Sequence, residues 1–108
     1  MIELVEYVAD DGQSPFGNWF EDIDTAAALR VRRALVRMEQ GNFGDSKAVR
    51  AGVMEYRITF GPGYRIYYAR EGETVIVRLG GGTKKRQWSD IETAKSHWAD
   101  YQAQKGRE

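Results

Sequence analysis

The apolar residues near the start of the chain recur at two different spacings, which predict a strand followed by a helix. Residues 2–8 form a β-branched and aromatic run that is typical of a strand. Farther along, Ser14 supplies a helix N-cap and Pro15 the first helical position. The apolar positions of this helix follow the i, i+3, i+4, i+7 spacing, and they are Phe16, Trp19, Phe20 and Ile23.

A second amphipathic helix is predicted to run to about Gln40. Asp24 or Thr25 caps its beginning, and Gly41 supplies a left-handed stop after its end. Its expected buried stripe consists of Val31, Ala34, Leu35 and Met38. A basic ridge on another face, which we interpret as a solvated helix surface, consists of Arg30, Arg33 and Arg37.

The second half of the chain predicts three strands and a last helix. Residues 41–52 are polar and rich in turn formers, which indicates a loop. Ser89, with Glu92 three residues later, has the pattern of a capping box at the start of the last helix. The apolar stripe of that helix consists of Ile91, Ala94, Trp98 and Tyr101. The strands are expected near 53–60, 64–70 and 74–80.

The order β-α-α-β-β-β-α predicts one α+β domain over residues 1–108, with helices packed on one face of a mainly antiparallel sheet. Arg57 and Arg65 stand at strand positions of this sheet. A two-residue loop at 62–63 would bury Arg57 among core residues, at a cost of about several kcal/mol. A three-residue loop at 61–63 instead places both arginines on the other face, and we expect this longer loop.

The next turn sets the remainder of the polar face. A two-residue turn at 71–72 would place Arg78 opposite Arg65. Arginines on adjacent strands repel one another unless an anion or a carboxylate joins them, so either an anion-binding surface or an internal ion-pair network is expected. This polar face borders the basic segment 83–86 and carries Glu55, Arg57, Arg65, Tyr67 and Arg78.

Composition limits the kind of protein. The chain has 108 residues, of which 42% are hydrophobic and 30% charged, as expected for one globular domain. It has no cysteine and one histidine, so we expect no disulfide, no metal site, no cofactor and a reducing cytoplasm. The N-terminus has neither a basic start nor a long apolar run, so neither secretion nor membrane insertion is expected.

A formal net charge of zero conceals an uneven distribution. Residues 1–29 hold seven acidic residues and no Lys or Arg. Residues 30–108 hold all sixteen bases and the other nine acids, a balance of +7, which favours a polyanionic partner. The alternative is that the fold simply mixes these charges over its surface.

The polar face suits single-stranded RNA, because arginines fork to two phosphate oxygens and aromatic rings stack on bases. If RNA is cleaved by attack of a ribose 2′-hydroxyl, Glu55 is the candidate base, while Arg57 and Arg65 are candidates for stabilising the transition-state charge. Residue types alone take the interpretation no further than an anion-binding sheet face. The candidates for clamping the scissile phosphate or protonating the leaving oxygen are Lys84, Lys85 and Arg86.

One long run resembles the HigB-like addiction-module killer proteins, a phage-derived branch of the RelE/ParE toxin superfamily: GVMEYRITFGPGYRIYYAREGETVIVRLGGGTKKRQWSDIETAKSHW. The resemblance covers nearly the whole chain and is most specific over residues 52–92. It implies a fold similar to a microbial ribonuclease and metal-independent cleavage of messenger RNA at the ribosome. It also implies neutralisation by a co-expressed antitoxin, often one with a helix-turn-helix domain, through which alone operator DNA is bound.

Within this resemblance, Arg65 in GYRIYY matches the family's phosphate-binding arginine, and Arg57 matches a basic residue implicated in catalysis. Glu55 stands where members have a lysine or another polar group. The segment 83–86 stands where members place a further catalytic base, for which any of its three basic residues is a candidate and to which we assign Lys85. The side chains expected to contact RNA are Tyr67, Arg78, Lys84 and Arg86.

Two other functions are compatible with this sequence: a toxin without chemistry that binds a protein such as DNA gyrase, and an RNA-binding module without cleavage. Some family members use active-site histidines, whereas His97 lies within the last helix and is expected to be structural or exposed. The run GGGTKK lacks the phosphate-loop spacing and is interpreted as a flexible connection. Trp98 is expected in the core, and Trp88 either in the core or stacked on a base.

Overall fold

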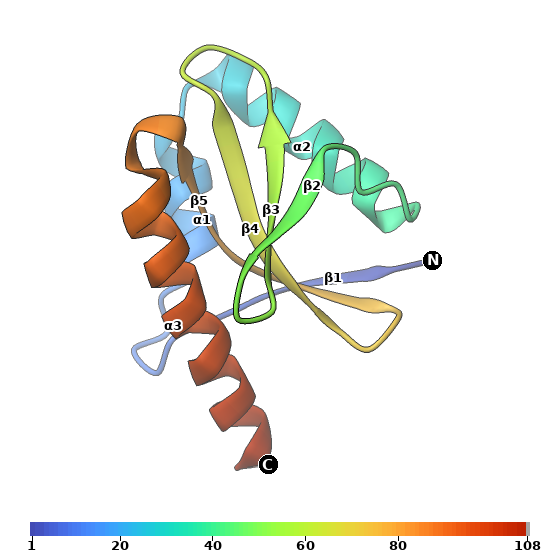
Figure 1. The fold of residues 1–108 in the computed structure, drawn as a ribbon, viewed down its shortest axis with the longest axis vertical. Helices are drawn as coiled ribbons and strands as arrows, with labels where there is room; N and C mark the ends of the chain where they lie inside the picture. Colours follow the sequence, from blue (N-terminus) through green and yellow to red (C-terminus); the bar gives the residue numbers. More distant parts are fainter. Residues whose placement is uncertain (108) are drawn as a thin grey trace.

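The computed structural model describes residues 1–107, which form a five-stranded mixed sheet and three α-helices (Figure 1). The strand order is β1-β5-β4-β3-β2; β1 pairs with β5 in parallel, and all other pairs are antiparallel. The fold is therefore α+β with a mainly antiparallel sheet, as predicted. The strands are β1 (Glu3–Glu6), β2 (Ser46–Arg50), β3 (Val53–Ile58), β4 (Tyr64–Glu71) and β5 (Val75–Thr83). The helices are α1 (Pro15–Asp22), α2 (Thr25–Glu39), a 3₁₀ turn (Lys84–Arg86) and α3 (Gln87–Gly106).

The first two helices begin where the sequence predicts. The Ser14 hydroxyl accepts a hydrogen bond from the Gly17 amide at 3.0 Å. The Asp24 carboxylate accepts one from the Ala27 amide at 2.7 Å, which identifies Asp24 as the cap of α2. Beyond α2, Gly41 adopts a φ of 84°. These caps satisfy amide groups that a helix would otherwise leave unpaired.

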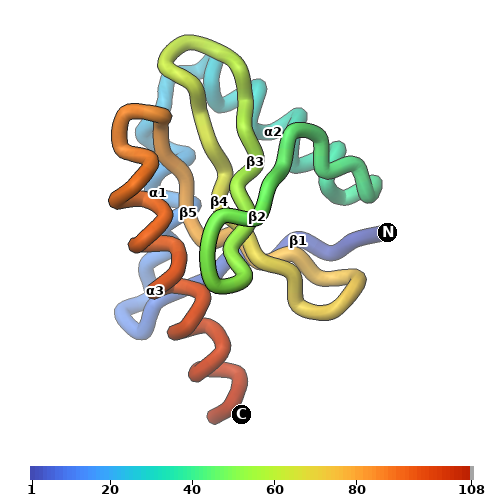
Figure 2. Tube along the Cα trace, in the orientation of Figure 1, coloured from blue at the N-terminus to red at the C-terminus, as the bar shows by residue number. Residues whose placement is uncertain are grey.

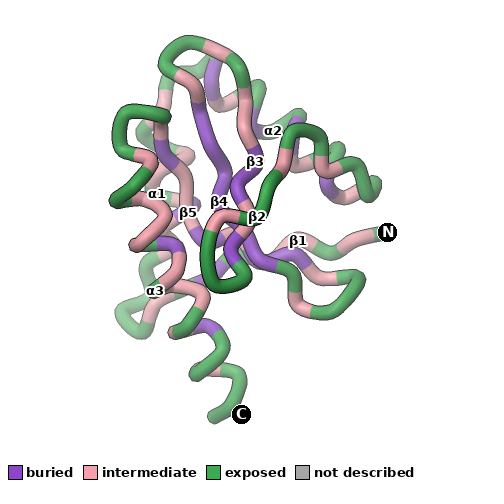
Figure 3. Tube along the Cα trace, in the orientation of Figure 1, coloured by how far each residue is buried: buried purple, intermediate pink, exposed green. Residues whose placement is uncertain are grey.

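Helices cover both faces of the sheet, so the prediction that they pack on one face is wrong. Figures 1 and 2 show α3 on one side of the strands and α1 with α2 on the other. The α3 side is built around Tyr67, Val77, Leu79, Ala94 and Tyr101. The other side is built around Phe16, Val31, Met38, Ile66 and Tyr68. Between them β4 is buried along most of its length (Figure 3).

The register of β3 and β4 confirms the face predicted for the two arginines. Arg57 lies directly opposite Arg65, and Glu55 lies opposite Tyr67. The connection runs over residues 59–63, two residues longer than predicted. Lengthening a hairpin loop by two residues keeps every side chain on its face, because side chains alternate with a period of two.

The register of β4 and β5 differs from the prediction. The turn is longer by one residue and a bulge follows it, so Arg78 lies opposite Tyr68 rather than Arg65. A shift of one residue moves a side chain to the other face. Arg78 therefore lies on the α1 side, with its Cζ 5.1 Å from the Phe16 ring centroid. Burial lowers the pKa of Arg78.

Three further predictions about the chain were wrong. Residues 46–50 form the edge strand β2 rather than loop, which makes the observed order β-α-α-β-β-β-β-α. The capping box does not form, because α3 begins at Gln87 and Glu92 instead contacts Arg50 at 2.7 Å. The run Gly80–Gly82 continues strand β5 opposite Tyr67, Ile66 and Arg65, so it is not a flexible connection.

Two of these glycines allow a helix to approach each face of β5. A Cβ atom at Gly81 would overlap the Trp19 ring of α1, and one at Gly82 would overlap the Asp90 carboxylate of α3. A Cβ atom at Gly80 would have no neighbour within 4 Å. The absence of side chains at 81 and 82 thus lets α1 and α3 pack closely against the same strand.

We expect Gly81→Ala to lower the free energy of unfolding by about 1–3 kcal/mol, because the new methyl group must displace the indole of Trp19. Gly80→Ala is the matched control on the same strand and should change stability by about 0.5 kcal/mol or less. Urea unfolding followed by tryptophan fluorescence measures both variants. Equal destabilisation by the two would contradict this packing.

Candidate functional site

The candidate site is built on β3 and β4 at the end of the sheet near the 3₁₀ turn. Arg57 and Arg65 face each other across these strands, and the Lys84 amide donates to the Gly63 carbonyl at 2.9 Å. This bond holds the start of the basic segment against the loop between the two strands. A pocket that we call the basic pocket lies there, and its lining residues include Asp45, Arg57, Thr59, Phe60, Arg65 and Lys84.

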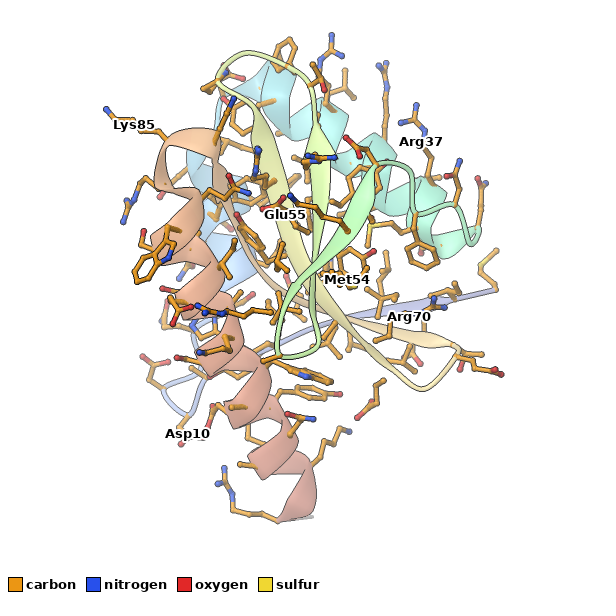
Figure 4. The ribbon with its side chains drawn as sticks, viewed as in Figure 1. Asp10, Arg37, Met54, Glu55, Arg70 and Lys85 are labelled. Carbon is orange, nitrogen blue, oxygen red and sulfur yellow. The ribbon has the colours of Figure 1, made fainter. Side chains whose placement is uncertain are left out.

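A fully buried carboxylate, that of Glu55, lies next to Arg65. Glu55 is 0% exposed and Arg65 is 7% exposed. The Arg65 Nε lies 3.4 Å from Glu55 Oε2, as an ion pair without a hydrogen bond. The same Oε2 accepts hydrogen bonds from Gln87 Nε2 at 2.9 Å and from the Tyr67 hydroxyl at 3.3 Å, while the buried Oε1 has no partner among the described residues. A buried charge is costly unless it is paired; Arg65 supplies the counter-charge, and Gln87 and Tyr67 supply hydrogen bonds. Glu55, labelled on β3 in Figure 4, therefore holds Arg65 and joins β3, β4 and α3.

This burial changes the roles predicted for two residues. Glu55 does not line the basic pocket and is closed to solvent, so it lies where no substrate proton reaches it. Tyr67 is 1% exposed, so its ring is closed to a stacking base. Burial, and then the neighbouring Glu55 charge, raise the pKa of Tyr67 and keep its hydroxyl protonated as a donor.

Arg57 has a different environment from Arg65. Its Nη2 lies 2.8 Å from Asp45 Oδ1, and the two side chains are 37% and 57% exposed. The hydrogen bond with Asp45 is the main cause that raises the pKa of Arg57. Both arginines thus have a carboxylate partner, and yet a pocket lies open beside them. The site as a whole has a formal charge of +1, from the cations Arg57, Arg65 and Lys84 and the carboxylates Asp45 and Glu55.

Three of the predicted site residues share the basic pocket, and other predicted residues lie elsewhere. Arg57, Arg65 and Lys84 line the basic pocket, as expected for a shared anion site. Lys85 and Arg86 are exposed and do not line it, and Figure 4 shows Lys85 extending away from Glu55. Arg78 lies on the opposite face. The residues missed are Asp45, which lies in the segment interpreted as a polar loop, and Gln87 and Asp90 of α3.

Asp90 lies beside the site, against Gly82, which pairs with Arg65. Burial raises its pKa, and the nearby Arg86 charge offsets part of this effect. Only a glycine at position 82 leaves room for its carboxylate. The capping-box pattern singles out Ser89 and Glu92, and no pattern in the sequence points to Asp90.

The lone histidine and two tryptophans lie outside the basic pocket. His97 Nδ1 lies 3.0 Å from the Leu79 carbonyl oxygen and its ring stacks on Tyr7, which confirms a structural role. Trp98 packs against the core and stacks on Tyr101. Trp88 is 74% exposed and so is not a core residue.

We expect Glu55→Gln to lower the free energy of unfolding by about 3 kcal/mol, because the change keeps the shape but leaves the buried Arg65 charge without its counter-charge. Glu73→Gln, in the exposed turn before β5, is the control and should cost about 0.5 kcal/mol or less. Chemical denaturation at neutral pH measures both. A loss no larger than that of the control would show that Arg65 does not depend on this carboxylate.

Residues 1–107, which the structure describes, contain neither a membrane-spanning helix nor a cluster of metal ligands. No helix there is long and apolar enough to cross a membrane. No group of three or more His, Asp or Glu side chains there is placed to hold a metal ion.

The chain is similar to a known protein over most of its length. No protein-family model matches the chain. A protein of Haemophilus influenzae, described as an uncharacterized protein, is 36% identical over 81 residues, which cover 74% of this chain and 82% of that protein. The chain therefore belongs to the same family as this H. influenzae protein.

Proposed function

We propose that the chain is the toxin of a type II toxin–antitoxin system, a HigB-like member of the RelE/ParE superfamily that cleaves messenger RNA at the ribosome. One observation carries the proposal: Arg57 and Arg65 lie directly opposite each other on β3 and β4 and share a pocket with Lys84. A phosphodiester gains negative charge as it is attacked, and cations fixed beside it stabilise that charge.

The cleavage step follows from the groups that line the basic pocket. The ribose 2′-oxygen forms a bond to phosphorus and the bond to the 5′-oxygen breaks, which yields a 2′,3′-cyclic phosphate and a 5′-hydroxyl. Asp45 is the carboxylate among the described lining residues, and it accepts the 2′-hydroxyl proton. Lys84 is the ammonium group among them, and it donates a proton to the leaving oxygen.

The two arginines bind the phosphate in different ways. Arg65 is held by a buried carboxylate, so its guanidinium is fixed before substrate binds. Arg57 is held by the exposed Asp45, and an exposed ion pair contributes only about 0–1 kcal/mol. Arg57 therefore exchanges Asp45 for a phosphate oxygen at little cost, and this exchange frees Asp45 to act as the base.

The proposal includes a protein partner and a cellular location. A toxin that acts on the ribosome works in the cytoplasm, and a co-expressed antitoxin with a helix-turn-helix domain keeps it inactive. Leu29 and Val36, seven residues apart on α2, are 48% and 46% exposed. Two large apolar side chains exposed along one helix support α2 as the surface that the antitoxin covers.

We expect Arg65→Ala to reduce cleavage about 10²–10³-fold, since it removes a fixed donor from the transition state. Because Glu55 loses its counter-charge in this variant, the assay uses chain shown to be folded. Arg70→Ala, at the exposed end of the same strand, should cleave like the unmodified protein. Primer extension on messenger RNA after induced expression maps the cuts, and end-group analysis with purified ribosomes tests for the cyclic phosphate.

Two results would contradict the nuclease. Full toxicity of Arg65→Ala would show that the arginine pair is not the site. DNA breaks without messenger RNA cuts would instead indicate a toxin that binds a protein target such as DNA gyrase. Binding of RNA without any cleavage would reduce the proposal to an RNA-binding module.

A further inference from the structure

A second pocket lies on the other side of the β3 edge, between that strand and α2. It receives Arg30, Arg33 and Arg37 from α2 and Arg57 from β3, and we call it the arginine groove. Its other lining residues are Ala34, Tyr56, Ile58 and Thr59. The three α2 arginines were interpreted from the sequence as a solvated ridge, but the structure places them around a hollow together with a residue of the candidate site.

The arginine groove has no acidic residue among its described lining residues. Arg33 and Arg37 are exposed, and no described carboxylate forms an ion pair with either of them. Arg57 has Asp45 as its partner at 2.8 Å, but the three α2 guanidinium groups around the hollow repel one another unless an anion lies among them. Each guanidinium also presents a planar fork of donors that matches phosphate oxygens.

The arginine groove and the basic pocket are continuous. Arg57, Ile58 and Thr59 line both. The guanidinium of Arg30 lies 4.0 Å from the ring centroid of Phe60, which lines the basic pocket. Figure 2 shows the loop that carries Phe60 passing close to the start of α2. A polyanionic chain bound in the basic pocket can therefore extend directly into the arginine groove.

We infer that the arginine groove is a second phosphate-binding subsite, which holds the RNA strand flanking the phosphate bound between Arg57 and Arg65. This inference rests on the proposed function. RNA is favoured over an acidic peptide because its charges repeat at every nucleotide. Arg57 lines both the basic pocket and the arginine groove, so consecutive phosphates of one strand can occupy the two. Arg37, which extends outward from α2 in Figure 4, marks the outer end of this path.

The test measures binding of 2′-O-methyl RNA, which lacks the attacking hydroxyl and is not cleaved. Probes of about three and about twelve nucleotides separate a ligand that fills only the basic pocket from one that also reaches the groove. For the longer probe, R33Q combined with R37Q should weaken binding roughly tenfold or more at moderate salt. The same variant should flatten the slope of log K against log salt by about 1.4, the value for two lost phosphate contacts on a single strand.

The short probe should bind the double variant and the unmodified chain equally. Arg32→Gln is the matched control, because Arg32 is exposed on the same helix but does not line the groove. It should leave the affinity for the longer probe nearly unchanged, apart from a small general effect of charge.

The outcomes separate this inference from the proposed function. If the double variant and Arg32→Gln weaken the longer probe equally, the groove is not a subsite, although loss of cleavage in Arg65→Ala would still support the nuclease. If the double variant keeps its RNA affinity but no longer binds an acidic antitoxin peptide, the groove is a protein site and the inference is wrong. If the unmodified chain binds neither probe, the proposed function fails together with the inference.

Discussion

The candidate site depends on one buried ionic contact, between the carboxylate of Glu55 and the guanidinium of Arg65. Glu55 extends from β3, Arg65 from β4, and Gln87, which donates to the same carboxylate oxygen, begins α3. A charge with no solvent contact must find its partners within the fold, so these three elements are fixed relative to one another. The 3₁₀ turn that carries Lys84 lies between β5 and α3, and its position follows from this arrangement.

The two opposed arginines are therefore not equivalent, although they occupy equivalent positions in the sheet. One is buried with its counter-charge and the other is half exposed beside Asp45. A fixed donor lowers the reorganisation needed in a transition state, while an exposed ion pair is easily exchanged for a substrate group. A pair of like charges on adjacent strands thus remains stable in the free protein and keeps a net positive charge for an anion.

The sequence predicted features that depend on local patterns and failed on those that depend on turn length or tertiary packing. The caps at Ser14 and Asp24 require only short-range hydrogen bonds, and both formed. The shared face of Arg57 and Arg65 survived a loop length that was wrong by two, because only the parity of the loop matters. Arg78 was placed on the wrong face because its turn was wrong by one residue. Neither the side on which α3 packs nor the burial of Glu55 has a signature in the periodicity, since both arise from contacts between distant segments.

The edge of the sheet explains how Arg57 can line both the basic pocket and the arginine groove. Strand β2 begins at Ser46, which pairs with Tyr56, and the last bond along this edge joins the Arg57 amide to the Asp45 carbonyl at 3.0 Å. Beyond Arg57, no strand of the described chain pairs with β3 on that side, so the space between its end and α2 stays open. A longer β2 would cover this edge and separate the basic pocket from the arginine groove. The shortness of β2 is thus the feature that leaves a continuous cationic path across the end of the sheet.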